Sequence, residues 1–146
     1  EEAFVGAQER TLASGKPLTL AMIDVDDFKR LNDALGHKAG DEALRHLADL
    51  LRLKLRPTDA VARYGGEEFV ILLPGAGTED ALSTVSRLQR ELTTHVFLHE
   101  ASRTFITFSA GITEVTADDS LATAINRADE AMYRAKHEGK NCVRTA

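Results

Sequence analysis

The stretch "AVARYGGEEFVILL", residues 60–73, decides the fold. Two strand-like segments, "AVARY" (60–64) and "EEFVILL" (67–73), flank the pair Gly65-Gly66. Strand-like runs separated by Gly-Gly are typical of a β-hairpin with a two-residue loop. The sequence therefore predicts an antiparallel hairpin at the centre of the chain.

Apolar periodicity before the hairpin predicts one strand and three helices. The run "LTLAMIDV", residues 18–25, has the length and the boundaries of a buried strand. Amphipathic or helical spacing covers residues 1–14, 27–35 and 41–55. The last of these helices is expected to end before Pro57, because proline cannot continue a helix.

The pattern after the hairpin predicts a helix over 78–94, a strand over 104–112, a helix over 118–138 and a short terminal strand. Together with the upstream elements, this order predicts an α+β fold with five strands and flanking helices. No linker or internal repeat divides the chain, so we expect a single domain over residues 1–146.

Composition narrows the class of protein. The 146 residues suit one domain. The formal charge of -5, from 18 basic and 23 acidic residues without a basic run, excludes an electrostatic footprint for duplex nucleic acid. A single cysteine, Cys142, excludes an internal disulfide and fits a reducing compartment. We expect a cytoplasmic segment without membrane contact, either separate or the cytoplasmic part of a membrane-attached protein.

Carboxylates gather at the mouth of the predicted hairpin. Glu67 and Glu68 follow the two glycines, and side chains in a strand alternate faces, so at least one glutamate reaches the rim. Asp24 and Asp26 share a face at the end of strand 18–25, and Asp24 would meet a glutamate if that strand pairs beside the hairpin. Clustered carboxylates favour Mg²⁺, which prefers oxygen ligands. The alternative is an ordinary turn with solvated acids.

Three blocks carry a resemblance to a known family. "RYGGEEF" (63–69), with "MIDVDDFKRLNDALGHKAGDEAL" (22–44) before it and "RADEAMYRAKHEGKN" (127–141) after it, resembles the GGDEF family of diguanylate cyclases in its GGEEF form. The likeness runs from about residue 18 to residue 143. It implies a mostly antiparallel sheet like that of class III nucleotide cyclases and polymerase palms. It also implies the joining of two GTP molecules into cyclic di-GMP, in the output domain of a longer signalling protein.

The resemblance implies a metal site and a nucleophile-activating group. Asp24, the backbone carbonyl of Val25, Glu67 and Glu68 match the family's ligands for Mg²⁺, with Mn²⁺ as an alternative. Glu67 also matches the group that helps deprotonate the attacking 3′-hydroxyl, and whether it is a base or only a ligand stays open. Asp26 stays open between a ligand and a structural residue that holds the strand end.

The resemblance also implies contacts with the nucleotide. Gly65 and Gly66 would let the backbone approach the α-phosphate and ribose. Asn32 and Asp41 match the guanine readers, since an amide and a carboxylate complement the edge of guanine. Their alternatives are an exposed helical residue for Asn32 and a helix N-cap for Asp41.

Three lysines match the family's phosphate contacts: Lys29, Lys136 and Lys140. The alternative for the last two is ordinary placement at the end of a helix, where the macrodipole favours cations. Lys140 stands where the family usually has arginine, which replaces a bidentate fork with a point charge.

The segment "RPTD", residues 56–59, matches the family's product-inhibition site, in which Arg56 and Asp59 grip cyclic di-GMP. A further arginine is expected, with Arg87 and Arg90 as candidates. The alternative is an ordinary arginine near a helix end and an ordinary aspartate in a turn.

The implied reaction constrains the assembly. The 3′-hydroxyl of each GTP must meet the α-phosphate of the other, so catalysis requires a homodimer with two facing domains. Two other classes of function remain open. One is a catalytically weak receptor module that binds GTP or cyclic di-GMP, and the other is a structural interaction domain, which would leave the matched motifs unexplained.

Overall fold

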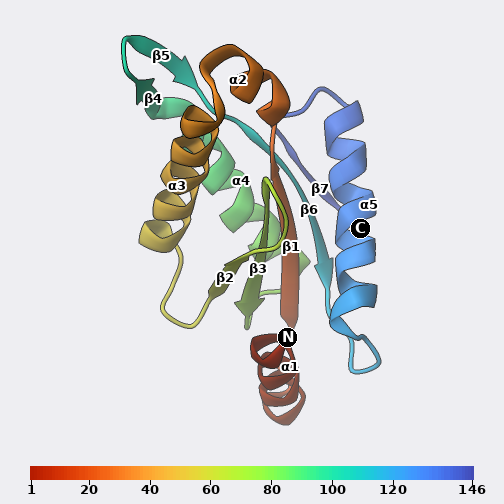
Figure 1. Cartoon of the computed structure of the whole chain (residues 1–146). Coiled ribbons are helices and arrows are strands. Elements are labelled where there is room, and N and C mark those ends of the chain that lie inside the picture. Colours follow the sequence, from red (N-terminus) through yellow and green to blue (C-terminus); the bar gives the residue numbers. More distant parts are fainter.

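The computed structural model describes residues 1–146, and five strands form its central sheet. Figure 1 shows this sheet with the helices around it. The sheet has the strand order β2-β3-β1-β6-β7. Only β7 runs parallel to its neighbour, and the other pairs are antiparallel. The predicted α+β class with a mostly antiparallel five-stranded sheet is confirmed. The strands are β1 Leu18–Val25, β2 Ala60–Arg63, β3 Glu68–Pro74, β6 Phe108–Glu114 and β7 Val143–Thr145.

Helices cover both faces of the sheet. The side chains of Ala21 and Ile23 on β1 join a core with α3 (His37–Lys54) and α4 (Thr78–Thr94). Leu20 and Met22 point to the other face, where α1 (Glu2–Ser14) and α5 (Leu121–His137) pack. A strand buried on both faces is expected to be mostly apolar, which explains the composition of β1. The one polar residue near its start, Thr19, is buried and donates its hydroxyl to the carbonyl oxygen of Ala76 at 2.7 Å. No helix is both long enough and apolar enough to cross a membrane.

Helix α5 touches the sheet at the level of the backbone. A Cβ added at Gly111 on β6 would lie 2.0 Å from the carbonyl oxygen of Ala128 and 2.3 Å from the nitrogen of Met132. Both atoms belong to the main chain of α5, so a side chain at this position has no room. Glycine here allows the helix to lie directly on the strand.

The central hairpin differs from its prediction. β2 ends at Arg63 and β3 begins at Glu68, so four residues rather than two connect the strands. The guanidinium of Arg63 donates to the carbonyl oxygens of Gly65 (3.2 Å) and Gly66 (2.6 Å). The prediction of a two-residue loop was therefore wrong. The two glycines and the Arg63 contacts together stabilise a longer turn than the two-residue turn that Gly65-Gly66 predicts.

A second correction concerns the predicted strand 104–112. It is two strands, β5 (Ser102–Phe105) and β6, separated by residues 106–107. β5 leaves the main sheet and pairs with β4 (Val96–His99) in a separate two-stranded ribbon, which was not predicted (Figure 1). Neither glycine nor proline marks the break, so the apolar run reads as continuous.

Two predicted helix starts were also wrong. α3 begins at His37 rather than at 41, so Asp41 lies inside the helix and is not its N-cap. α5 begins at Leu121 rather than at 118, after Ser120, whose side chain forms a capping box with Thr123. The remaining helix, α2, spans Phe28–Leu35 at the end of β1.

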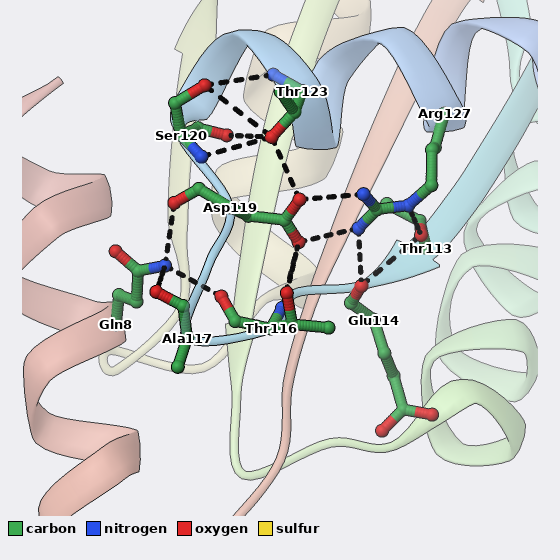
Figure 2. Close-up of polar contacts among 9 residues, drawn as sticks. All are labelled: Gln8, Thr113, Glu114, Thr116, Ala117, Asp119, Ser120, Thr123 and Arg127. Carbon is green, nitrogen blue, oxygen red and sulfur yellow. Dashed lines mark hydrogen bonds and ion pairs between the residues drawn. The ribbon is translucent and has the colours of Figure 1, made fainter.

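Helix α1 is fastened to the loop between β6 and α5 (Figure 2). The side-chain amide of Gln8 donates to the carbonyl oxygens of Thr116 (2.7 Å) and Asp119 (2.9 Å). The Asp119 carboxylate in turn binds the guanidinium of Arg127 through both oxygens, at 2.7 and 2.6 Å. This charge-assisted cluster lies at the end of the sheet opposite to Asp24 and Asp26, because it follows the last residue of β6.

Candidate active site

Strand pairing brings the predicted acidic residues together. Asp24 on β1 is the register partner of Glu68 on β3, so their side chains project from the same face. The backbone N–H of Val25 donates to the carbonyl oxygen of Glu67 at 3.2 Å, which extends the pairing to the turn. The predicted convergence of Asp24 with a glutamate is confirmed.

The Glu68 carboxylate lies against Gly65 in the turn, in space that a side chain at residue 65 would share. A Cβ at Gly65 would lie 2.8 Å from Oε1 of Glu68, whereas a Cβ at Gly66 would meet nothing within 4 Å. Gly65 therefore shapes the inner side of the turn. Gly66 is open on the outer side, as a close approach of a ligand to the backbone requires.

The environment opposes ionisation of two of the carboxyl groups. Burial raises the pKa of Asp24, a shift that Lys136 counteracts only partly and that the charge of Glu67 reinforces. Burial also raises the pKa of Glu68, and the charges of Asp24, Asp129 and Glu67 add to the shift. A bound cation would relieve this repulsion.

The donor set suits a metal that shares its ligands with a substrate. No group of three or more His, Cys, Asp or Glu side chains lies close enough together to enclose an ion. Mg²⁺ commonly takes only one or two carboxylates and completes its shell with water and phosphate oxygens. The facing carboxylates of Asp24 and Glu68, with the Val25 carbonyl beside them, fit that kind of site.

Lys136 of α5 reaches the same place. Its Nζ lies 3.0 Å from Oδ1 of Asp24 and 3.3 Å from Oδ1 of Asp26. Burial lowers the pKa of Lys136, but the hydrogen bonds and charges of the two aspartates outweigh this effect and raise it. The lysine thus stays charged beside the carboxylates.

The other two predicted phosphate-binding lysines lie around the start of α2. Lys140 Nζ lies 2.5 Å from Oδ1 of Asp27, the residue before that helix, and this hydrogen bond lowers the pKa of Asp27. Lys29 is exposed on the first turn of α2. The structure therefore brings Lys136 and Lys140 to the end of β1 and leaves Lys29 facing solvent next to them.

The predicted guanine readers lie on neighbouring helices. Oδ1 of Asn32 on α2 is buried and has no hydrogen-bond partner. A Cβ at Gly40 would lie 1.8 Å from that oxygen, so Asn32 packs on the residue that precedes Asp41 in α3. Asp41 itself is exposed. A buried acceptor without a donor fits an N–H group supplied by a ligand.

Gly40 is a site residue that the sequence interpretation missed. A glycine inside a helix usually has a packing reason, but the helix was predicted to begin at residue 41, so Gly40 was not recognised as one. Here it allows the carboxamide of Asn32 to lie against the backbone of α3.

The predicted inhibition-site residues form an ion pair. Nη2 of Arg56 lies 2.7 Å from Oδ1 of Asp59, and it also donates to the carbonyl oxygen of Pro74 at 2.9 Å. The two residues line a pocket of ≈ 310 Å³ together with Arg87 of α4. Arg90 does not line this pocket. Of the two candidate arginines, the structure places Arg87 with the RPTD segment.

Comparison with known proteins gives the family. Residues 2–142 match the family model described as "Diguanylate cyclase, GGDEF domain". This chain belongs to the GGDEF family, and the resemblance noted in its sequence is confirmed.

Individual relatives agree with this assignment. Diguanylate cyclase DgcP of Pseudomonas aeruginosa is 42% identical over 132 residues, which cover 90% of this chain but 20% of that protein. Diguanylate cyclase SiaD of the same species was solved in complex with its activator SiaC. Its structure matches this one with a TM-score of 0.93 at 34% identity, and the match covers 99% of this chain and 56% of the SiaD chain. The GGDEF domain of DgcB from Caulobacter crescentus, solved with c-di-GMP, has a TM-score of 0.88 at 30% identity, covering 95% and 83% of the two chains.

Proposed function

We propose that this domain is a diguanylate cyclase, which joins two GTP molecules into cyclic di-GMP and releases two pyrophosphates. Membership of the GGDEF family supports the reaction. The observation that carries the proposal is the pairing of Asp24 with Glu68, two carboxyl groups of raised pKa beside the charged Lys136. Perturbed ionisable groups gathered at a strand end are typical of catalytic sites.

Mg²⁺, or Mn²⁺ in its place, would be held by Asp24 and Glu68, which already face each other, and by the carbonyl of Val25. Glu67 would join these ligands when the ion binds, because the three carboxylates do not enclose an ion beforehand. When bound, the metal would neutralise charge that develops at the α-phosphate and lower the pKa of the attacking hydroxyl. Gly65 and Gly66 would let the nucleotide approach the backbone beside these ligands. The open space outside Gly66 supports this placement.

The remaining polar groups would bind the two ends of GTP. Lys136, Lys140 and Lys29 would bind the phosphate chain as point charges. Asn32 and Asp41 would select guanine, because the free Oδ1 of Asn32 can accept an N–H and the Asp41 carboxylate can accept two adjacent N–H groups. Adenine offers the opposite pattern of donors and acceptors.

In each half-reaction, the 3′-oxygen of one GTP attacks the α-phosphorus of the other. The bond from the α-phosphorus to the bridging oxygen breaks, and pyrophosphate leaves. The hydroxyl proton passes to the Glu67 carboxylate or to solvent. Because one domain supplies one nucleotide site, we propose that two copies face each other during turnover.

Cyclic di-GMP would also bind away from the active site. Arg56 and Asp59 would contact the product, and Arg87, which lines the same pocket, would add a third group. Arginine can grip phosphate or guanine through two parallel hydrogen bonds. Product held here would restrain the pairing of two domains.

The domain would work as part of a longer protein. The chain spans 20% of the length of DgcP. We propose that this domain is an output unit for a sensory input and that it acts in the cytoplasm, where GTP is available.

The direct test is to incubate the purified domain with Mg²⁺ and either GTP or ATP, and to identify the products by mass spectrometry. We expect cyclic di-GMP and pyrophosphate to form from GTP and no corresponding product to form from ATP. The specific activity should rise with enzyme concentration, because dimers form. Tight binding of GTP or cyclic di-GMP without turnover by the dimeric protein would instead indicate a receptor module. Equal use of ATP would contradict the roles of Asn32 and Asp41.

A further inference from the structure

A buried carboxylate that the proposed chemistry does not use lies next to the acidic pair. The side chain of Asp26 is 2% exposed. It accepts a hydrogen bond from the hydroxyl of Thr107 at 2.8 Å and another from the hydroxyl of Ser109 at 2.6 Å. These two contacts join the end of β1 to the start of β6.

Two further donors come from the C-terminal part of the chain. The backbone N–H of Asn141 donates to Oδ2 of Asp26 at 2.9 Å, and Nζ of Lys136 approaches Oδ1 at 3.3 Å. Each carboxylate oxygen therefore receives one hydroxyl and one N–H donor. Asp26 connects three separate segments, and two of its four contacts are with the region that carries the lysines.

The turn that Asp26 holds has an unfavourable backbone conformation. Lys140 has φ 64° and Asn141 has φ 49°, directly after Gly139 at φ 120°. Two successive non-glycine residues in the left-handed region persist only where their surroundings fix them. The Asp26 carboxylate fixes the second of them from the sheet. From this turn Lys140 extends to Asp27.

We propose that Asp26 is a positioning residue for the triphosphate: it holds Lys136 beside Asp24 and holds the turn that directs Lys140 toward the start of α2. The inference rests on the proposed function, because it requires a phosphate chain at these lysines. Asp26 acts through them and does not contact the substrate, since its side chain is buried and its acceptor positions are occupied.

The chemistry of the four donors explains why an aspartate is needed. Asparagine has nearly the same shape but replaces one acceptor oxygen with an NH₂ donor. A hydroxyl such as that of Thr107 or Ser109 can rotate and accept from that NH₂. The N–H of Asn141 and the ammonium of Lys136 cannot accept. Whichever way the asparagine amide turns, one of the two contacts to the lysine region is lost.

The test compares two ligands that differ in their phosphates. The parent protein and Asp26→Asn are titrated with Mg²⁺ and either 3′-deoxy-GTP, which lacks the attacking hydroxyl, or GMP. We expect Asp26→Asn to weaken binding of 3′-deoxy-GTP by about tenfold or more, the loss expected for one charge-assisted contact, and to change GMP affinity by less than about threefold.

Asp119→Asn is the matched control. It removes a carboxylate that is 5% exposed, also bonded to hydroxyls and a cation, but at the opposite end of the sheet. We expect it to lower thermal stability while leaving both nucleotide affinities unchanged. If Asp26→Asn weakened the binding of 3′-deoxy-GTP and of GMP equally, Asp26 would be a merely structural residue. Unchanged binding of 3′-deoxy-GTP by Asp26→Asn would also overturn the inference.

A measurement on the parent protein covers the case in which Asp26→Asn does not fold. In ¹⁵N NMR spectra, 3′-deoxy-GTP should shift the amide signals of Lys140 and Asn141 more than GMP does, and equal shifts would overturn the inference. A parent protein that binds 3′-deoxy-ATP as tightly as 3′-deoxy-GTP would instead contradict the proposed function, so the two failures can be told apart.

Discussion

Asp24 and Glu68 face each other across the antiparallel pair β1–β3, at the end of the sheet where the Gly65-Gly66 turn begins. Their mutual repulsion contributes to the raised pKa of Glu68, after burial. The folded protein therefore maintains an arrangement that is unfavourable for its own stability and favourable for a cation.

This relationship predicts the effect of removing either charge. Glu68→Gln or Asp24→Asn should reduce cyclic di-GMP synthesis by at least about 100-fold, because a metal ligand is lost. The melting temperature should rise slightly, by less than about 3 °C, because each variant removes a charge that the folded state disfavours. Rates of pyrophosphate release and calorimetric melting measure the two effects. Glu130→Gln, exposed on α5, is the control, and near-normal turnover in both site variants would disprove the ligand assignment.

A substitution in the turn should act through Glu68. In Gly65→Ala, the new Cβ would lie 2.8 Å from Glu68 Oε1, so the carboxylate must move away from its present position. We expect the pKa of Glu68, followed by ¹³C NMR in the nucleotide-free protein, to change in this variant. Gly66→Ala should leave it unchanged, because nothing lies within 4 Å of that Cβ. The same titration curve for both variants would contradict the packing role of Gly65.

The predicted inhibition site can be tested with two arginines of α4, because Arg87 lines the pocket and Arg90 does not. Arg56→Ala and Arg87→Ala should each weaken cyclic di-GMP binding by at least about tenfold, since a charge-assisted hydrogen bond contributes roughly 1.5–3 kcal/mol. Arg90→Ala removes the same charge from α4 but not from the pocket, so its affinity should match that of the parent protein. Calorimetric titration distinguishes these variants. Equal affinities for all four proteins would remove the inhibition site while leaving the cyclase proposal intact.

Asp119 predicts how stability depends on pH. The hydrogen bonds from Arg127 hold the pKa of Asp119 well below its usual range, and those from Thr116 and Thr123 add to the effect. A lowered folded-state pKa stabilises the protein above the unfolded-state pKa of about 3.9, and this contribution is lost as the pH falls toward the folded-state value. The free energy of unfolding of Asp119→Asn, measured in urea, should thus be lower than that of the parent at pH 7, with a smaller gap at pH 3. A gap that widens at pH 3 would contradict the assignment.

The sequence predicted the parts of this site that depend on strand ends and local motifs. The apolar run 18–25 placed Asp24 at the end of β1, and the "GGEEF" segment limited the facing glutamate to Glu67 or Glu68. The contact between Lys136 and Asp24 could be expected only through the family resemblance. Spacing within a helix does not tell which strand end that helix reaches.

Other errors have local causes. The start of α3 was misplaced because its N-cap is Gly36, which provides no side-chain cap, whereas Asp41 has the residue type of one. The β4–β5 ribbon was missed because the change of pairing partner after β5 depends on tertiary contacts rather than on a breaking residue.

The contact between Gly111 and α5 limits how this domain can vary. A tight spot between side chains can be relieved when neighbouring rotamers change, but here a Cβ would meet two main-chain atoms, and no rotamer can move them. The separation of α5 from β6 is therefore fixed by the two polypeptide backbones. Gly111→Ala should cost more stability than truncating a neighbouring apolar side chain such as Ile125 to alanine, as urea unfolding can measure. Elsewhere in the core, a larger side chain can be offset by a smaller one beside it. At Gly111 no such second substitution exists, because the atoms in the way belong to the main chain.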